Sequence, residues 1–168
     1  MHEDISIRWM RRKDVSTVAD IERNCFEDNW DEQSIIEMLN DKTTIIKVAS
    51  LDNHIRGYNF YMPTKECFQI LNIAVEPGYR RKSVGAFMVA DMFKNSNHFK
   101  RNIDAWVCER KIDVLLFLKK HGFKPLMLVE DLFATGDGIL MRFSGTEDIE
   151  IYDHYIEMIG DRDFKAFY

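Results

Sequence analysis

The sequence has few of the residues that mark several whole classes of protein. It holds 3 Pro and 8 Gly among 168 residues, which excludes a collagen-like or low-complexity chain. No stretch approaches the roughly 18 apolar residues that a membrane-spanning helix requires. Charges run through the N-terminal segment, which therefore lacks the apolar core of a signal peptide. These absences predict a cytoplasmic protein without a membrane partner.

Cysteine and histidine are too sparse to build a cross-linked or metal-bound core. Cys25, Cys67 and Cys108 form no C-x-x-C pair, and each stands among apolar residues. We expect three reduced, buried thiols rather than disulfides. The 5 His residues are scattered without ligand spacing, so no metal site is predicted.

Acidic residues slightly outnumber basic residues. The chain has 23 Lys and Arg against 28 Asp and Glu, a net charge of −5, which argues against a nucleic-acid partner. Its 46% hydrophobic content is too high for a disordered chain and suits one domain with its own core. We place this domain at residues 1–145. Residues 146–168 are predicted as a helical extension packed on it, with a homodimer contact or a lid as alternatives.

The periodicity of apolar residues predicts strands and helices that alternate after an initial pair of helices. Asp14 and Asp31 are placed to cap these two helices, and Gly122 suits the C-terminal cap of a later one. Strands are expected at 5–10, 43–51, 55–62, 67–75, 103–109, 124–129 and 138–143, with further helices at 83–97 and 112–120. This order predicts an α/β (α+β) domain of three layers.

Residues 73–86 carry the clearest chemical signal. A nearly continuous apolar strand ends at a Pro-Gly turn, and three consecutive cations, Arg80, Arg81 and Lys82, precede a helix. The first N–H groups of a helix lack internal acceptors and favour anions, and the small residues that follow allow a phosphate to approach the backbone. The segment is neither a Walker loop nor a G-x-G-x-x-G fingerprint. It is a candidate pyrophosphate site, with a solvated basic corner as the alternative.

This segment resembles the acetyl-CoA motif of the GCN5-related N-acetyltransferase (GNAT) superfamily, (Q/R)-x-x-G-x-(G/A). The stretch RRKSVG, residues 80–85, matches the motif except at Ser83, where the family has Gly. Within the superfamily the chain is most similar to the ribosomal-protein alanine N-acetyltransferases, through LNIAVEPGYRRKSVG, IERNCFEDNWDEQS (21–34) and FLKKHGF (117–123).

The resemblance implies a three-layer α/β/α fold with a mixed sheet that is splayed at its centre. It also implies an enzyme that binds acetyl-CoA as co-substrate and passes the acetyl group directly to a primary amine, such as a protein N-terminus. The pantetheine arm would pair with the backbone near Ile73 to Val75, and Lys111 stands where the family has Asn at a helix start. Ser83 would replace Gly without strain if its φ is negative. The implied cofactor-binding residues are Ile73, Ala74, Val75, Arg80, Arg81, Lys82, Ser83, Val84, Gly85, Ala86 and Lys111.

The acid and base positions depart from the family pattern. The Glu that serves as the catalytic base in the ribosomal-protein branch aligns with Trp106, and the Tyr that serves as the catalytic acid aligns with Leu118. Gln69 stands where the histone-acetylating branch has a Glu. The catalytic candidates are therefore Asp104, on the strand face of Trp106, and Glu109, near the strand end. One of these is the base, or water carries the proton, or the chain is an acyl-CoA-binding protein with little or no catalysis. An interaction protein that keeps the fold without CoA is a further alternative.

Overall fold

The computed structural model describes residues 4–99 and 102–144. The order of elements expected from the sequence is confirmed over this part of the chain, and the predicted extension at 146–168 lies outside it. No helix of the described residues is long and apolar enough to cross a membrane. The elements are β1 (Ile5–Trp9), α1 (Val15–Cys25), α2 (Glu32–Asn40), β2 (Ile45–Leu51), β3 (His54–Pro63), β4 (Cys67–Val75), α3 (Val84–Phe99), β5 (Asn102–Cys108), α4 (Ile112–Lys120), β6 (Lys124–Phe133) and β7 (Gly136–Phe143), with short 3-10 turns at Arg12–Asp14 and Pro77–Tyr79.

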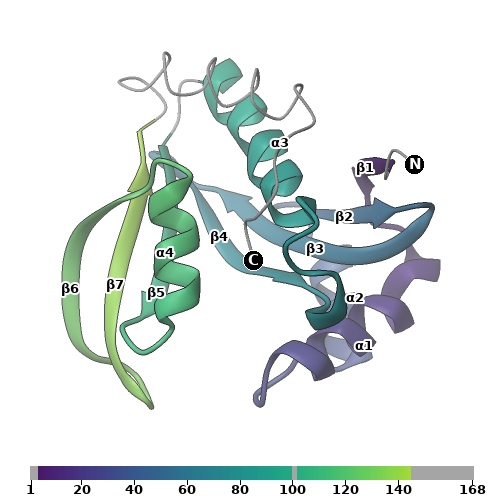
Figure 1. Ribbon diagram of the computed structural model, residues 1–168, viewed down its shortest axis with the longest axis horizontal. Helices are drawn as coiled ribbons and strands as arrows, with labels where there is room; N and C mark the ends of the chain where they lie inside the picture. Colours follow the sequence, from purple (N-terminus) through teal and green to yellow (C-terminus); the bar gives the residue numbers. More distant parts are fainter. Residues whose placement is uncertain (1–3, 100–101, 145–168) are drawn as a thin grey trace.

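The strands form one mixed sheet in the order β1-β2-β3-β4-β5-β7-β6. Every neighbouring pair is antiparallel except β4 and β5, which α3 connects by a crossover of the kind that parallel strands require. Figure 1 shows the consequence: β1 to β4 form one half of the molecule, and β5, β7 and β6 form the other.

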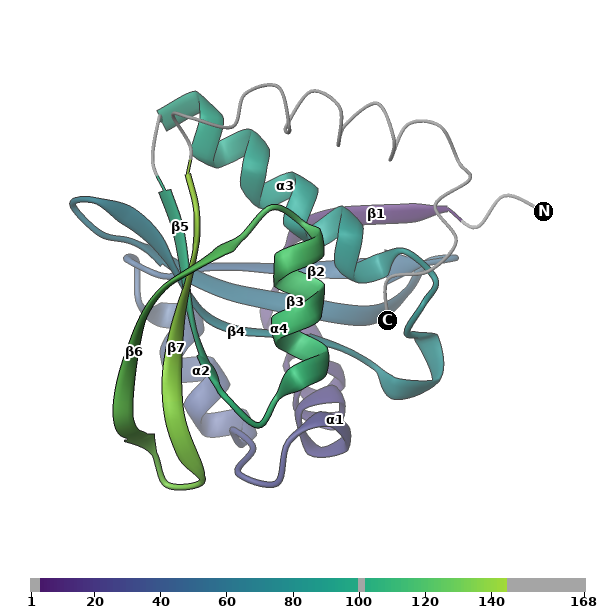
Figure 2. The ribbon, with the colours of Figure 1, turned by 60° about the vertical axis from the view of Figure 1, so that its left-hand side comes forward.

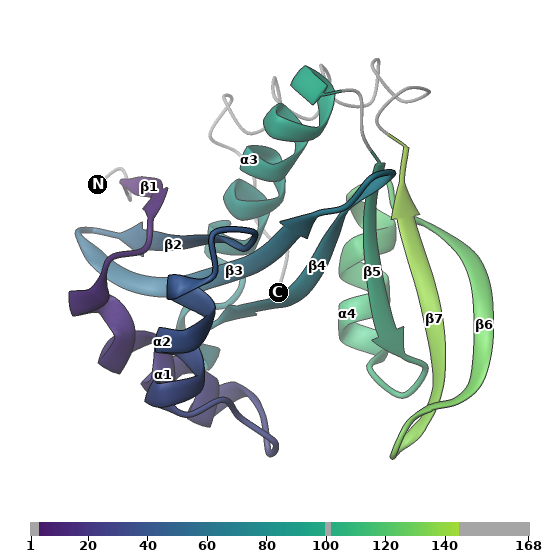
Figure 3. The same ribbon diagram turned by 180° about the vertical axis from the view of Figure 1, so that it is seen from behind.

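The strands of the two halves pair with each other over a short parallel ladder. β4 pairs with β5 from Cys67 to Ile70, opposite Asn102 to Ala105. Beyond these residues the strands diverge (Figure 3), while β4 stays paired with β3 as far as Val75. We call the unpaired stretch beyond Ile70 and Ala105 the splay. The centrally splayed sheet implied by the family resemblance is therefore present.

Helices cover both faces of the sheet, which gives the three predicted layers. α1 and α2 lie against one face of the first half, and α3 and α4 lie on the opposite face (Figure 2). One apolar cluster joins α3 and α4 to the strands, and within it the rings of Phe93 and Phe143 stack at 4.0 Å between centroids. Another lies beneath α1 and α2 and includes Tyr58 and Phe60. Burial of these large side chains supplies the main stabilisation.

The predicted helix caps have different outcomes. Asp31 accepts a hydrogen bond from Ser34 N at 2.8 Å at the start of α2, and Gly122 has a φ of 87° after α4, so both predictions are confirmed. The prediction for Asp14 is wrong. Its side chain makes no cap bond to α1 because Arg8 holds both carboxylate oxygens, at 2.7 and 3.0 Å.

The last two strands are longer than predicted. The sequence suggested strands at 124–129 and 138–143 with a Gly-containing loop between them, whereas β6 continues to Phe133 and β7 begins at Gly136. The glycines therefore belong to the hairpin. At Gly138 a Cβ would lie 2.3 Å from Cδ2 of Leu132, so glycine here makes room for a side chain from the facing strand.

Candidate functional site

One edge of β4 faces the splay. Glu76 N donates to Arg56 O at 2.8 Å at the end of the β3–β4 ladder, and hydrogen-bonded and non-bonded pairs alternate along an antiparallel ladder. The alternation directs the backbone groups of Ala74 toward β3 and those of Ile73 and Val75 toward the splay. Of the three residues predicted to pair with pantetheine, Ile73 and Val75 thus present their backbone groups to the splay.

The loop after β4 is built from residues with left-handed backbone conformations. Arg81 has a φ of 63° and Ser83 a φ of 64°, and α3 starts at Val84. The condition under which Ser83 was expected to replace Gly without strain is therefore not met. The backbone changes direction sharply between the 3-10 turn and α3, and left-handed residues make that change. Such residues beside right-handed ones turn successive N–H groups toward one anion.

α3 approaches the sheet closely at its first turn, because β3 carries glycine there. A Cβ on Gly57 would lie 2.8 Å from the carbonyl oxygen of Ala74, 3.2 Å from Cε of Met88 and 3.3 Å from Cγ1 of Val84. The predicted site residues Val84, Gly85 and Ala86 are all buried. A ligand at this position would therefore meet the backbone of the helix start rather than these side chains, and the packing holds that backbone beside the end of β4.

Arg80 is turned inward, unlike the two cations that follow it. Its Nε donates to the carbonyl oxygen of Val75 at 3.2 Å, and its guanidinium also reaches Sγ of Cys25 at 3.7 Å. The Cys25 thiol donates to the same carbonyl at 3.4 Å, and burial raises its pKa. Arg80 therefore fixes the end of β4, whereas Arg81 and Lys82 are exposed and bring positive charge to the loop surface.

The ring of Tyr79 contacts two cations near the start of α3. The guanidinium carbon of Arg56 lies 3.8 Å from the ring centroid of Tyr79, and Nζ of Lys82 lies 5.6 Å from the same centroid. Arg56 also donates to Glu76 Oε2 at 2.8 Å. The ring and the carboxylate hold these charges beside the start of α3, where a pyrophosphate would meet them.

The two predicted catalytic carboxylates lie at opposite ends of β5. Asp104 is buried at the closed end of the splay, and Arg142 binds both of its oxygens at 2.7 Å. Gln69 donates to the backbone carbonyl of Asp104 at 3.3 Å. Glu109 follows the last residue of β5, is half-buried, and its N–H donates to Asp137 O at 2.9 Å. The carboxylate of Asp104 is thus engaged in an ion pair with Arg142, and Glu109 lies at the open end of the splay.

The remaining predicted positions are spread around the same strand and helix. Trp106 is half-buried and is the first β5 residue beyond the last rung of the parallel ladder. Leu118 is fully buried in the core under α4, and Lys111 is exposed immediately before that helix. Cys108 is buried, with Sγ 3.5 Å from Oγ1 of Thr135, consistent with a structural thiol.

A buried polar cluster beside the splay escaped the sequence analysis. Glu22 of α1 is fully buried, and its Oε1 accepts hydrogen bonds from Tyr58 Oη and Asn72 Nδ2 while Trp30 N donates to Oε2 at 3.4 Å. Burial raises the pKa of the Glu22 carboxyl. The helical period could have identified it: Glu22 follows Val18 by one helical turn and therefore falls on the apolar stripe of α1.

Comparison with known proteins gives one family and a set of relatives with the same fold. Residues 15–123 match the model of the acetyltransferase (GNAT) family. A Bacillus subtilis (strain 168) protein, named as a candidate ribosomal protein bS18-alanine N-acetyltransferase, is 27% identical over 129 residues, covering 74% of this chain and 84% of that protein.

Solved structures of other proteins share this fold. The ribosomal-protein-S18-alanine N-acetyltransferase from Escherichia coli superimposes with a TM-score of 0.76 at 14% identity, over 85% of this chain and 95% of that one. The PaiA N-acetyltransferase from Thermoplasma acidophilum, solved in complex with coenzyme A, gives a TM-score of 0.70 at 15% identity, over 84% and 99% of the two chains. At these identities the structures establish the fold alone.

Proposed function

The chain belongs to the acetyltransferase (GNAT) family, and on that premise we propose that it transfers an acetyl group from acetyl-CoA directly to a primary amine, with a protein N-terminus as the acceptor. One observation carries the proposal: the edge of β4 that faces the splay ends against a basic loop at the start of a long helix. The family membership and the names of the Bacillus subtilis and Escherichia coli relatives support the choice of acceptor.

The residues at the end of β4, in the loop that follows and at the start of α3 fit acetyl-CoA. The backbone groups of Ile73 and the N–H of Val75 are available to an extended amide-bearing arm, which would pair with them as a neighbouring strand does; the Val75 carbonyl oxygen already accepts from Arg80 and Cys25. The backbone N–H groups at the start of α3 would hold the pyrophosphate, with Arg81 and Lys82 supplying countercharge. Arg80 would act indirectly, by holding the end of β4. Acetyl-CoA supplies the acetyl group as an activated thioester.

The acceptor reaches the reaction as an ammonium ion, so a proton must leave it before attack. Arg142 occupies the carboxylate of Asp104, and neither Trp106 nor Leu118 has a titratable group. We propose that a water molecule beside the acceptor amine takes the proton. Glu109, at the open end of the splay, is the remaining carboxylate candidate to receive it. Positioning of the two substrates then supplies most of the rate acceleration.

The transfer is tested with acetyl-CoA and a short peptide that has a free N-terminal alanine. We expect mass spectrometry to detect one acetyl group on the peptide and none on the same peptide with a blocked N-terminus. Thiol release should match acetylated peptide one for one. Absence of transfer to this peptide and to N-terminal serine, glycine and polyamine acceptors would contradict the proposal.

A second candidate function is acyl-CoA binding with little or no turnover. The burial of Leu118 and the ion pair of Asp104 favour it, because neither position then supplies an acid or a base. The two functions differ in one result: a binder is stabilised by acetyl-CoA but releases no thiol in the presence of any acceptor.

A further inference from the structure

Asn72 stands where the buried Glu22 cluster meets the splay. The β3–β4 register shifts at Leu71, and two consecutive side chains consequently point to the same face: Leu71 packs beneath α1 and α2, and Asn72 donates to Glu22 of α1. Such a pair is the signature of a β-bulge. On this face of β4, Leu71 and Asn72 are the first side chains beyond the last rung of the parallel ladder, Ile70 opposite Ala105.

The first β5 residue beyond that rung lies on the same face. Ile103, Ala105 and Val107 belong to the core under α3 and α4, so strand alternation places Trp106 on the opposite face. Asn72 and Trp106 therefore flank the narrow end of the splay from its two strands, on the face of the sheet that α1 and α2 occupy. Each is half-buried.

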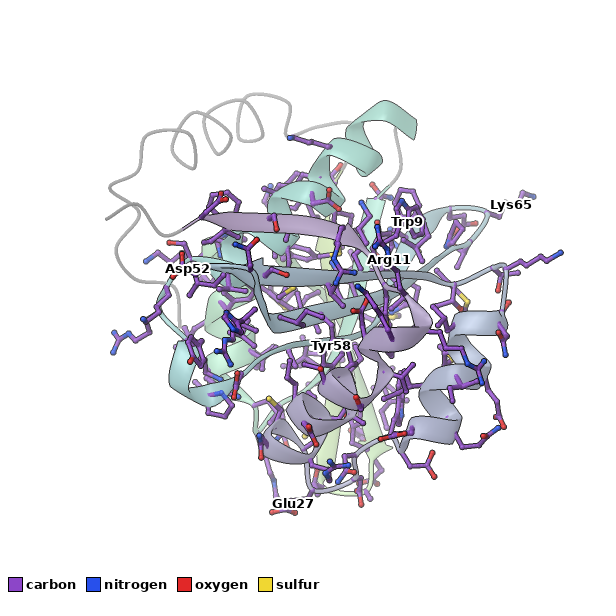
Figure 4. All side chains as sticks on the ribbon, turned by 90° about the vertical axis from the view of Figure 1, so that its right-hand side faces the viewer. Trp9, Arg11, Glu27, Asp52, Tyr58 and Lys65 are labelled. Atoms are coloured by element: carbon purple, nitrogen blue, oxygen red, sulfur yellow. The ribbon has the colours of Figure 1, made fainter. Side chains whose placement is uncertain are left out.

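The hydrogen bonds of Glu22 decide which way the Asn72 amide points. Asn72 Nδ2 donates to Glu22 Oε1, and the same carboxyl group accepts from Tyr58 Oη and Trp30 N. A carboxyl group that accepts from three donors holds the nitrogen of the Asn72 amide, rather than its oxygen, on its side. Tyr58 Oη also lies 3.3 Å from Asn72 Nδ2. Figure 4 shows Tyr58 where β3 meets α1, and both Tyr58 and Glu22 are fully buried. The carboxamide oxygen, Oδ1, is thus on the side of Asn72 that faces away from the cluster.

From this geometry we propose that Asn72 Oδ1 accepts a hydrogen bond from the amine of the acceptor, and that Glu22 is a positioning residue that holds the amide in this orientation. The inference rests on the proposed function, since it requires the cofactor arm to follow β4 from Val75 toward Ile70. An arm on that edge brings its reactive end to the narrow end of the splay, next to Asn72. The bond from the amine would direct the nitrogen lone pair toward the acetyl group.

The cluster also orders the wall on the acceptor side. Glu22 joins α1, β3, β4 and the loop before α2 through Tyr58, Asn72 and Trp30. The ring of Trp30 stacks on Phe60 at 5.3 Å between centroids. A single carboxylate therefore fixes both the hydrogen-bond acceptor and the loop that borders it.

The test compares the same substitution at two asparagines. Asn72→Leu removes the carboxamide oxygen, whereas Asn59→Leu on β3 is the control. Asn59 lies on the opposite face of the sheet and is fully buried, and its amide has no hydrogen-bond partner among residues 4–99 and 102–144. Both variants replace an amide by an apolar side chain of similar size. Kinetics are measured with acetyl-CoA and the peptide that has a free N-terminal alanine.

We expect Asn72→Leu to lower kcat/KM for the peptide roughly ten- to hundredfold, the usual effect of losing a hydrogen bond to a charged group. KM for acetyl-CoA should change less than about twofold in both variants, and Asn59→Leu should leave the peptide kinetics within about twofold, because only the acceptor contact is removed. Glu22→Gln should lower kcat/KM for the peptide less than Asn72→Leu, because the new amide permits both orientations of Asn72.

Equal peptide kinetics in Asn72→Leu and Asn59→Leu would overturn the proposal. If Asn72→Leu does not fold, Asn72→Ser replaces it, because serine keeps a hydroxyl donor for Glu22 but has no carboxamide oxygen; the same loss is expected. A loss that affects both substrates equally would also refute the acceptor role. If the wild type is stabilised by acetyl-CoA but acetylates no amine, the proposed function fails, and this inference fails with it.

Discussion

Replacement of Ser83 by glycine should stabilise the protein. Ser83 has a φ of 64°, and an L-residue in this region costs about 1–2 kcal/mol relative to a right-handed conformation. Glycine removes that cost but gives the unfolded chain more freedom, which offsets about 0.4–1 kcal/mol. The difference predicts a gain of about 0.5–1 kcal/mol, or about 1–4 °C in Tm for a chain of this size.

The assay is urea and thermal unfolding of matched serine variants. Ser16 lies in α1, is exposed and is absent from the residues with positive φ, so Ser16→Gly should lose about 0.5 kcal/mol through its lower helix propensity. Ser83→Ala separates the hydroxyl from the backbone: it keeps the left-handed strain and should not be stabilised. A Ser83→Gly variant that is less stable than wild type would refute the assignment of strain to this loop.

The remaining predictions concern the ion pair between half-buried Arg142 and buried Asp104, and a buried histidine. Arg142→Leu should cost about 3 kcal/mol in urea unfolding, because Asp104 would be left buried and charged; a loss below about 1 kcal/mol would contradict this reading. Burial lowers the pKa of His121 from 6.5 to about 3, so stability should be fully present above about pH 6.5 and decline as pH falls toward about 3. When the pH is lowered from about 7 to about 4.5, the free energy of unfolding should fall by about 2–3 kcal/mol more in wild type than in His121→Leu. Equal falls in the two proteins would contradict this prediction.

Local patterns in the sequence were sufficient for most of the fold. The apolar run of β4, the turn that ends it and the caps at Asp31 and Gly122 are features of neighbouring residues, and each appears in the structure. The splay is different: it came from the family resemblance, because the register between β4 and β5 depends on residues far apart in the chain.

The details that the sequence did not predict depend on long-range or junction geometry. Glu22 and Asn72 are 50 positions apart, so no local period links them. The left-handed φ of Ser83 depends on how the loop joins two packed elements, which the identity of the residue does not encode. The cap prediction for Asp14 failed because Arg8, on the preceding strand, competes for the same carboxylate. In each case the outcome depends on how elements distant in the sequence pack against one another.

The most direct test of the account is whether acetyl-CoA binds at the loop before α3. Thermal unfolding is measured with and without acetyl-CoA for wild type, Arg81→Glu and, as a control, Arg12→Glu, an exposed arginine in the turn before α1. At 100 times Kd the ligand should stabilise wild type and Arg12→Glu by about 2.7 kcal/mol, or about 5–10 °C, and Arg81→Glu much less. No shift in wild type, or an equal shift in all three proteins, would contradict the site.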